Sequence, residues 1–343
     1  MIAVVDFRDR RPVWSLPAGA AKRLREGAPD GWLFRFVAAP TDGSGDGGAR
    51  ASEEALAAVR DADAYLGAGV PLAVLEAGPG LRWIHSGSAG VSSALLAALE
   101  GRDIVFTNSA GTHAPPVAET AIAMILHFAR GLDIAVRAQA AGSWDRAAYD
   151  AADGPVREVA GATVGVIGYG GIGSEIGRRA AALGARVLGL RRRAGKAEKA
   201  DGAAEILAGP DGLRRLLRES DYVVLAVPET EATRALIDAG ALVDMRPGAV
   251  LVNVARGRLV DEDALVEALA AGRLRGAGLD VFATEPLPTG HPLWGMDTVL
   301  ITPHVSAVSG RYWEREIDLI LENLSLFDRG LPLRNVVDHG AGY

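Results

Sequence analysis

The sequence contains no cysteine. Disulfide bonds, thiolate metal sites and cysteine nucleophiles are therefore excluded. Basic residues are fewer than acidic ones: the sequence has 36 Lys and Arg and 43 Asp and Glu, which gives a formal charge of -7. Since phosphate contacts need a basic face, this balance argues against nonspecific nucleic-acid binding. We expect no nucleic-acid partner and no metal site.

Long apolar runs are missing as well, and no signal peptide is expected. The most apolar helical run, "AIAMILHFAR", is short and contains His127, so we expect no membrane span. The first residues, "MIAVVDFRDR", lack a basic segment before an apolar stretch, which speaks against a signal peptide. The 343 residues suffice for two domains, each with its own core. A cytoplasmic enzyme is the default expectation.

Short apolar runs alternate with helical segments along the chain. Such runs predict strands at 2–7, 32–39, 64–68, 81–87 and 104–109, and a second alternating series runs from 162 to 307. Strands that alternate with helices indicate a parallel sheet with crossover helices. Residues 118–142 form one long helical pattern, and a further helix at 315–330 should stop at Gly330.

A glycine-rich segment, "VGVIGYGGIGSEIGRRA", carries Gly168, Gly170 and Gly173 in the spacing G-x-G-x-x-G. An apolar strand precedes it and a helix follows, which is the context that a dinucleotide-binding motif requires. The first glycine permits the tight turn, the second lets a pyrophosphate approach the backbone, and the third lets helix and strand pack closely. Free N–H groups at the helix start would bind the phosphates. The alternative is a turn of the same shape without a ligand.

The strand after this helix ends in Arg191, Arg192 and Arg193. NAD-binding units place an acid there for the ribose 2'-hydroxyl, and here none follows until Glu198. A guanidinium cannot accept that hydrogen bond, but it can bind a 2'-phosphate with paired donors. NADP(H) is therefore favoured as the cofactor. NAD(H) remains the alternative, in which the arginines only form a solvated strand end.

Three ionisable residues further along each follow an apolar strand: Arg256, Glu285 and His304. The carboxyl ends of parallel strands line the ligand crevice of an open sheet. Reduction of a 2-keto acid by hydride transfer needs a cation for the carboxylate and carbonyl oxygen, which Arg256 suits. It also needs a proton donor, which suits His304, and a carboxylate that orients the donor and favours its protonated form, which suits Glu285. Each residue alone could be a surface or turn residue, but together they indicate a catalytic site.

These segments resemble the D-isomer-specific 2-hydroxyacid dehydrogenase family. The glycine segment, "VNVARGRLVDEDALVEAL", "GAGLDVFATEPLP" and "LITPHVSA" are similar to its main motifs. The resemblance implies an α/β fold with two doubly wound parallel-sheet lobes. A Rossmann dinucleotide-binding domain, residues 113–305, would be inserted into a flavodoxin-like substrate domain, residues 1–112 plus 306–343. The implied substrate is a small 2-keto or 2-hydroxy acid, and the reductase branches for glyoxylate and hydroxypyruvate often carry basic residues where Arg191 stands.

The resemblance also assigns roles to residues. It makes Arg256 the substrate-binding arginine, Glu285 the partner of the histidine and His304 the acid/base. Asp280 matches an aspartate that hydrogen-bonds the nicotinamide carboxamide, with the backbone at Val254 nearby. The cofactor-binding candidates are Gly168, Tyr169, Gly170, Gly171, Ile172, Gly173, Arg191, Arg192, Val227, Pro228, Thr233, Val254, Ala255 and Asp280.

The substrate end is predicted from the turn at Ser86–Gly90, which lies between a strand and a helix. Consecutive backbone N–H groups in such a turn bind anions, and the matching family loop binds the substrate carboxylate through its backbone. Ser88, Ala89, Gly90 and Arg256 are the substrate-binding candidates; a plain glycine-rich turn is the alternative. Five residues could shape the pocket, although side chains at such positions more often form core or subunit contacts: Trp83, His85, Trp144, Tyr312 and Trp313.

Two other functions stay open. Family relatives serve as nucleotide-sensing corepressors with similar site residues, although the acidic chain without a long polar tail favours an enzyme. A formate dehydrogenase-like enzyme is disfavoured, because that branch carries Gln where Glu285 stands. The resemblance implies a homodimer, with the apolar helix from Ala118 as the expected contact.

Overall fold

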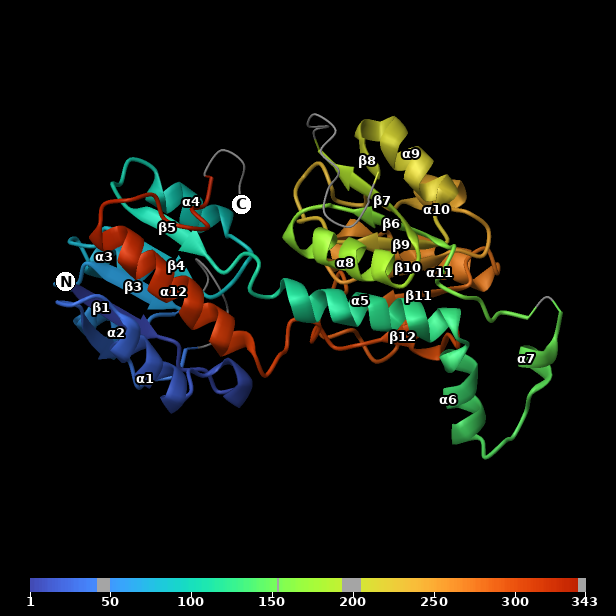
Figure 1. Ribbon diagram of the computed structural model, residues 1–343, viewed down its shortest axis with the longest axis horizontal. Coiled ribbons are helices and arrows are strands. Elements are labelled where there is room, and N and C mark those ends of the chain that lie inside the picture. Colours follow the sequence, from blue (N-terminus) through green and yellow to red (C-terminus); the bar gives the residue numbers. More distant parts are fainter. Residues whose placement is uncertain (42–49, 153, 193–204, 339–343) are drawn as a thin grey trace. The chain divides into compact units, whose positions relative to one another are not determined.

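The computed structural model describes residues 1–41, 50–152, 154–192 and 205–338 (Figure 1). The glycine-rich stretch at 42–49, Arg193, Glu198 and His339 lie outside the described residues. Contacts divide the chain into unit 1, Met1–His113 with Val308–Tyr343, and unit 2, Ala114–Ala307. Each unit holds a parallel sheet between helices, so the predicted fold class is confirmed.

Unit 1 is built on a five-stranded sheet in the order β2-β1-β3-β4-β5, which is the flavodoxin-like order. Its strands are β1 (Ile2–Asp6), β2 (Leu33–Phe36), β3 (Ala64–Gly67), β4 (Trp83–Ser86) and β5 (Val105–Asn108). Its helices are α1 (Ala18–Gly27), α2 (Glu53–Ala58), α3 (Leu72–Ala77), α4 (Ser93–Leu99) and α12 (Tyr312–Asp328). Because side chains alternate along a strand, Ile84 packs towards α2, α3 and α4, whereas Trp83 packs towards α1 and α12.

Unit 2 contains a seven-stranded sheet in the order β12-β11-β10-β9-β6-β7-β8. Its strands are β6 (Thr163–Ile167), β7 (Arg186–Arg191), β8 (Glu205–Ala208), β9 (Tyr222–Leu225), β10 (Val250–Asn253), β11 (Gly276–Leu279) and β12 (Val299–Ile301). Its helices are α5 (Ala114–Ala129), α6 (Leu132–Ala140), α7 (Ala147–Asp150), α8 (Gly171–Ala182), α9 (Gly209–Glu219), α10 (Ala239–Asp244) and α11 (Glu262–Ala270). Helices α5 and α8 cover one face of the sheet, and α9, α10 and α11 cover the other.

The prediction of one helix over 118–142 is wrong. The chain forms α5 and α6, separated by Gly131, whose φ of +66° lies in the left-handed region that interrupts a helix. By contrast, the helix expected at 315–330 is present as α12, and Gly330 follows it with a φ of +64°. Among the described residues, no helix is both long and apolar enough to cross a membrane.

Candidate functional site

The carboxyl edge of the unit 2 sheet gathers the nucleotide and catalytic candidates. Gly168 follows β6. This strand lies between β7 and β9 in the sheet, and the order of the strands reverses at this point. Ligands of open α/β sheets bind in the crevice outside the carboxyl ends of the strands at such a point. The other candidates follow neighbouring strands: Arg191 ends β7, Val227 and Pro228 follow β9, Val254 to Arg256 follow β10, Asp280 follows β11 and His304 follows β12.

The glycine loop has the shape that a phosphate needs. Gly168 has a φ of +94°, and a Cβ atom there would lie 2.5 Å from the carbonyl oxygen of Ala226. A Cβ at Gly173 would lie 2.0 Å from the carbonyl oxygen of Gly168, so only glycine lets α8 approach the turn. At Gly170 and Gly171 a Cβ would meet nothing within 4 Å, which leaves this surface open to a ligand.

The start of α8 adds donors to this open surface. Its first hydrogen bond runs from the backbone N–H of Ser174 to Gly170. The backbone N–H groups of Gly171, Ile172 and Gly173 therefore have no acceptor within the helix, as at any helix N-terminus. Backbone donors beside an uncovered glycine fit a pyrophosphate.

Tyr169 lies inside the loop but belongs to the core. Its side chain is buried and fills the space beside Gly177 and Gly189, where a Cβ would lie 2.2 Å from the Tyr169 hydroxyl oxygen and 2.5 Å from a ring carbon, respectively. Only its backbone faces the loop, and its carbonyl oxygen accepts a hydrogen bond of 2.8 Å from Nε of Arg191. The guanidinium carbon of Arg191 lies 5.9 Å from the centre of the Tyr169 ring, and the side chains of Arg191 and the neighbouring Arg192 are exposed.

The loop after β9 is closed by Thr233. Its hydroxyl donates to the carbonyl oxygen of Pro228 at 2.8 Å and accepts from the backbone N–H of Thr230 at 2.8 Å. Thr233 thus fixes the turn that begins at Val227. Its hydroxyl is already used in this turn, so a direct contact with the cofactor stays a prediction.

The Arg256 loop is held by a residue that sequence reasoning missed. Asn253, which is buried at the end of β10, donates from Nδ2 to the carbonyl oxygen of Arg256 at 2.9 Å and accepts from the backbone N–H of Ala255 at 3.1 Å. A Cβ at Gly257 would lie 1.8 Å from the carbonyl carbon of Phe282. The loops after β10 and β11 therefore touch backbone to backbone, while the Arg256 side chain stays exposed.

The structure brings Glu285 and His304 together. Oε2 of Glu285 lies 2.7 Å from Nδ1 of His304, and Oε1 accepts from the backbone N–H of Phe282 at 2.9 Å. An ionised carboxylate only accepts hydrogen bonds, so Nδ1 carries the proton and Nε2 is left for a ligand. Both side chains keep surface, with 48% of His304 and 36% of Glu285 exposed. This is the arrangement that an acid/base histidine needs.

Asp280 holds the loop that carries His304. It has no exposed surface, and its carboxylate accepts from the Thr302 hydroxyl at 2.6 Å and from the backbone N–H groups of Val305 and Ser306 at 2.9 and 3.0 Å. Its carbonyl oxygen accepts from the backbone N–H of His304, whose φ is +53°. Few residues adopt this left-handed conformation without support. Contact with nicotinamide stays a prediction, whereas this supporting role is what the structure shows.

In unit 1, the predicted substrate loop Ser86–Gly90 is fixed at Gly87. The backbone N–H of Gly87 donates to Gly67 at 2.7 Å, and its carbonyl oxygen lies 3.3 Å from both Nε2 of His113 and the hydroxyl of Tyr312. Burial raises the pKa of Tyr312 well above its ordinary value and lowers the pKa of His113. Both residues are therefore neutral donors near pH 7.

The rest of this loop turns its carbonyl groups into the protein. The carbonyl oxygen of Ser88 accepts from the backbone N–H of Ser109 at 3.2 Å, and that of Ala89 accepts from Nδ2 of Asn108 at 3.0 Å. In the described part of the chain, the backbone N–H groups of Ala89 and Gly90 have no acceptor. Unpaired donors beside satisfied carbonyl groups are what an anion-binding turn offers.

The aromatic candidates do not share one role. Trp83 and His85 have no exposed surface, and Tyr312 and Trp313 are also buried, so these four residues belong to the interior of unit 1. Trp144 is 94% exposed and lies between α6 and α7 of unit 2. No group of three or more potential metal-binding side chains occurs among the described residues.

The family model "D-isomer specific 2-hydroxyacid dehydrogenase, NAD binding domain" matches residues 122–306. A D-3-phosphoglycerate dehydrogenase of Mycobacterium tuberculosis is 34% identical over 293 residues, which are 84% of this chain and 54% of that protein. A glyoxylate reductase of Pyrococcus furiosus is 35% identical over 284 residues, which are 81% of this chain and 83% of that protein. The chain therefore spans about half the length of the phosphoglycerate dehydrogenases that it matches.

A solved structure is similar over the whole chain. The D-isomer specific 2-hydroxyacid dehydrogenase from Xanthobacter autotrophicus, crystallised in complex with NADPH and MES, has a TM-score of 0.79 and 30% sequence identity. The match covers 99% of each chain.

The buried position of Asp280 yields a prediction on stability. In Asp280→Asn, an amide NH₂ replaces one of the two oxygens and leaves at least one backbone N–H without its acceptor, which should lower the free energy of unfolding by about 1–3 kcal/mol. Asp261→Asn is the matched control, because Asp261 is an exposed N-cap of α11, where Asn serves about as well. Urea unfolding of both variants measures the difference. Equal stability of the two variants would contradict the role given to Asp280.

Proposed function

The chain belongs to the D-isomer-specific 2-hydroxyacid dehydrogenase family, and we propose that it reduces a small 2-keto acid to a D-2-hydroxy acid. Glyoxylate- and hydroxypyruvate-type acids are the proposed substrates, with NADPH as the favoured cofactor. The observation that carries the proposal is the pair formed by Glu285 and His304 at the same sheet edge as the glycine loop. A glyoxylate reductase among the relatives and the basic residue at Arg191 support the choice of substrate class.

The residues of unit 2 divide the chemistry among them. The open surface at Gly170 and the backbone donors of α8 fit the pyrophosphate of a nicotinamide dinucleotide, which supplies the hydride when bound. Arg256 binds the substrate carboxylate and orients the carbonyl group. His304, with Nδ1 turned to Glu285, gives a proton from Nε2 to the carbonyl oxygen as that oxygen gains charge. Glu285 stabilises the imidazolium before the proton leaves.

In unit 1, the turn at Ser88–Gly90 is the proposed carboxylate-binding segment. The backbone N–H groups of Ala89 and Gly90 are the donors that the fold leaves unused. Both belong to a turn whose carbonyl groups point into the protein. An anion bound on the outer side of the turn would therefore contact N–H donors and no carbonyl oxygen. We assign the Ser88–Gly90 segment to carboxylate binding on this basis.

A substrate panel tests the proposed function. NADPH oxidation should be fast with glyoxylate or hydroxypyruvate and slower with pyruvate and bulkier 2-keto acids. His304→Ala should lose most of this activity, on the order of a hundredfold or more in kcat, while its affinity for NADPH stays close to that of the wild type. Oxidation of D-3-phosphoglycerate is the competing activity within the family. A protein that binds NADPH but turns over no acid of the panel would instead be a nucleotide-sensing binding protein.

Arg191 and Arg192 supply the test of cofactor choice. If they bind the 2'-phosphate, Arg191→Ala with Arg192→Ala should lower kcat/KM for NADPH by roughly tenfold to several hundredfold, allowing for solvent exposure. The loss of the hydrogen bond from Arg191 to Tyr169 should slightly weaken the binding of both cofactors. The measured quantity is therefore the ratio of kcat/KM with NADPH to kcat/KM with NADH. Equal losses for the two cofactors, or a wild type that prefers NADH, would contradict the proposal.

We also propose that the protein works as a homodimer, although not through the helix named above. The apolar residues of α5, among them Ala118 and Ala121, are already buried in the core of unit 2. Exposed apolar side chains lie instead on and after α6, at Leu132, Val136 and Trp144. Helices α6 and α7 project from the body of unit 2 in Figure 1. Sedimentation velocity should show a dimer that Trp144→Ser weakens; a monomeric wild type would refute it.

A further inference from the structure

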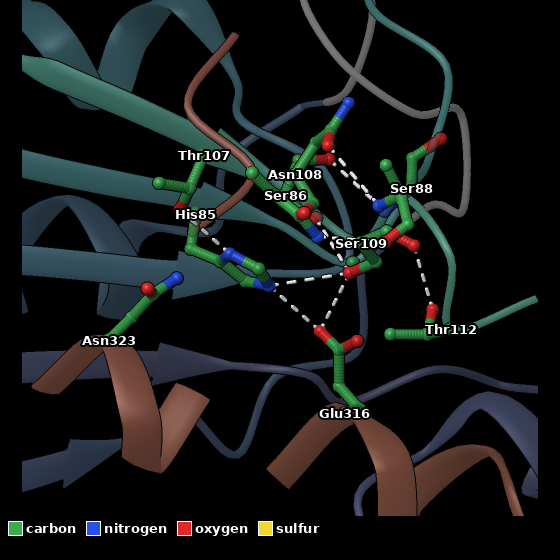
Figure 2. Close-up of polar contacts among 12 residues, drawn as sticks. His85, Ser86, Ser88, Thr107, Asn108, Ser109, Thr112, Glu316 and Asn323 are labelled. Atoms are coloured by element: carbon green, nitrogen blue, oxygen red, sulfur yellow. Dashed lines mark hydrogen bonds and ion pairs between the residues drawn. The ribbon is translucent and has the colours of Figure 1, made fainter. Parts of the chain in front are cut away.

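A buried polar cluster lies between the unit 1 sheet and α12. His85, Thr107, Ser109 and Glu316 have no exposed surface. His85 on β4 and Thr107 on β5 alternate with Ile84 and Phe106, which face the opposite side of the sheet, so both polar side chains point to α12. Figure 2 shows His85 and Ser109 converging on Glu316.

The cluster is connected by short hydrogen bonds. Oε1 of Glu316 lies 2.8 Å from Nε2 of His85 and accepts from the hydroxyl of Ser109 at 2.8 Å. Nδ1 of His85 lies 2.9 Å from the hydroxyl of Thr107, which Trp83 also contacts from its indole nitrogen at 2.9 Å. Burying such groups is costly, and replacing a buried ion pair by apolar side chains of similar volume is often neutral or stabilising. Stability alone therefore gives no reason for the cluster.

The cluster ends at the substrate loop. The hydroxyl of Ser109 lies 2.9 Å from the carbonyl oxygen of Ser86, and the backbone N–H of Ser109 donates to the carbonyl oxygen of Ser88 at 3.2 Å. Glu316 lies one helical turn after Tyr312, whose hydroxyl faces the carbonyl oxygen of Gly87. Two routes from α12 thus reach the carbonyl groups on the inner side of the loop.

We propose that Glu316, His85 and Ser109 are positioning residues that hold the Ser88–Gly90 loop with its backbone N–H groups towards the substrate carboxylate. The carbonyl oxygen of Ser88 accepts from the backbone N–H of Ser109, and the side chain of Ser109 is anchored by its hydrogen bond to Glu316. The inference rests on the proposed function, since it names what sets the affinity of the carboxylate-binding loop. The acid/base residues all lie in unit 2, so the cluster should affect substrate binding more than the chemical step.

The test compares two buried serines. Ser109→Ala should raise KM for glyoxylate roughly three- to tenfold, the effect of about one lost hydrogen bond, with kcat and the affinity for NADPH nearly unchanged. Ser220→Ala is the matched control, because Ser220 is also fully buried but donates to Leu216 in unit 2. It should leave KM unchanged. A wild-type KM in Ser109→Ala, or equal effects in both variants, would overturn the proposal.

A second pair of variants separates positioning from folding. Glu316→Gln keeps an oxygen that accepts from Ser109 and should retain most of the substrate affinity, whereas Glu316→Ala should raise KM as Ser109→Ala does. If Ser109→Ala does not fold, the difference in KM between Glu316→Gln and Glu316→Ala tests the positioning role instead. A KM in Glu316→Ala equal to that of the wild type would refute the positioning role.

A variant of the loop itself separates this inference from the proposed function. Ala89→Pro removes one of the two unused backbone N–H groups and should raise KM. If Ala89→Pro raises KM but the cluster variants do not, only the positioning role fails. If Ala89→Pro also leaves KM unchanged, the assignment of the loop to carboxylate binding fails. If the protein turns over no acid, amide hydrogen exchange of residues 86–91 tests the positioning role. Ser109→Ala should accelerate this exchange, and Ser220→Ala should not.

Discussion

The close approach of two backbones at the carboxyl edge of the unit 2 sheet constrains the whole candidate site. No side chain fits at Gly257, because its Cα faces the backbone of Phe282 directly. This contact sets the Arg256 loop beside the loop that ends in Glu285. Asp280 then fixes the next loop, which carries His304. Three strands that neighbour one another in the sheet, β10, β11 and β12, thereby place an arginine, a carboxylate and a histidine at one edge.

Buried carboxylates shape the loops in both units. Asp280 accepts backbone N–H groups of the His304 loop, and Glu316 accepts the Ser109 hydroxyl below the Ser88–Gly90 loop. A carboxylate offers about four acceptor positions on two oxygens, so one side chain can satisfy several donors where no water reaches. Such groups must remain paired, because a buried charge without partners is strongly destabilising. The two carboxylates thus fix these loops from inside each unit, whereas the side chains of Arg256 and His304 are exposed.

Local patterns in the sequence predicted much of the fold and several residues of the candidate site. Apolar runs between glycine-rich turns located the strands, and the spacing of Gly168, Gly170 and Gly173 predicted a turn whose steric demands the structure shows. The order of Arg256, Glu285 and His304 after successive strands predicted that they share an edge. Other features depend on tertiary contacts that no local pattern contains. Asn253 looked like an ordinary strand end, Gly131 sits inside an uninterrupted helical pattern, and His85 and Glu316 are 231 residues apart.

The central claim is that Glu285 acts through His304 as one catalytic unit. A double-mutant cycle on kcat/KM for glyoxylate tests it most directly, using Glu285→Gln, His304→Asn and the combined variant. If Glu285 serves only to orient and charge the imidazole, the combined variant should be no slower than His304→Asn, within about twofold. Losses that multiply in the combined variant would show that the two residues act independently, which would contradict this account.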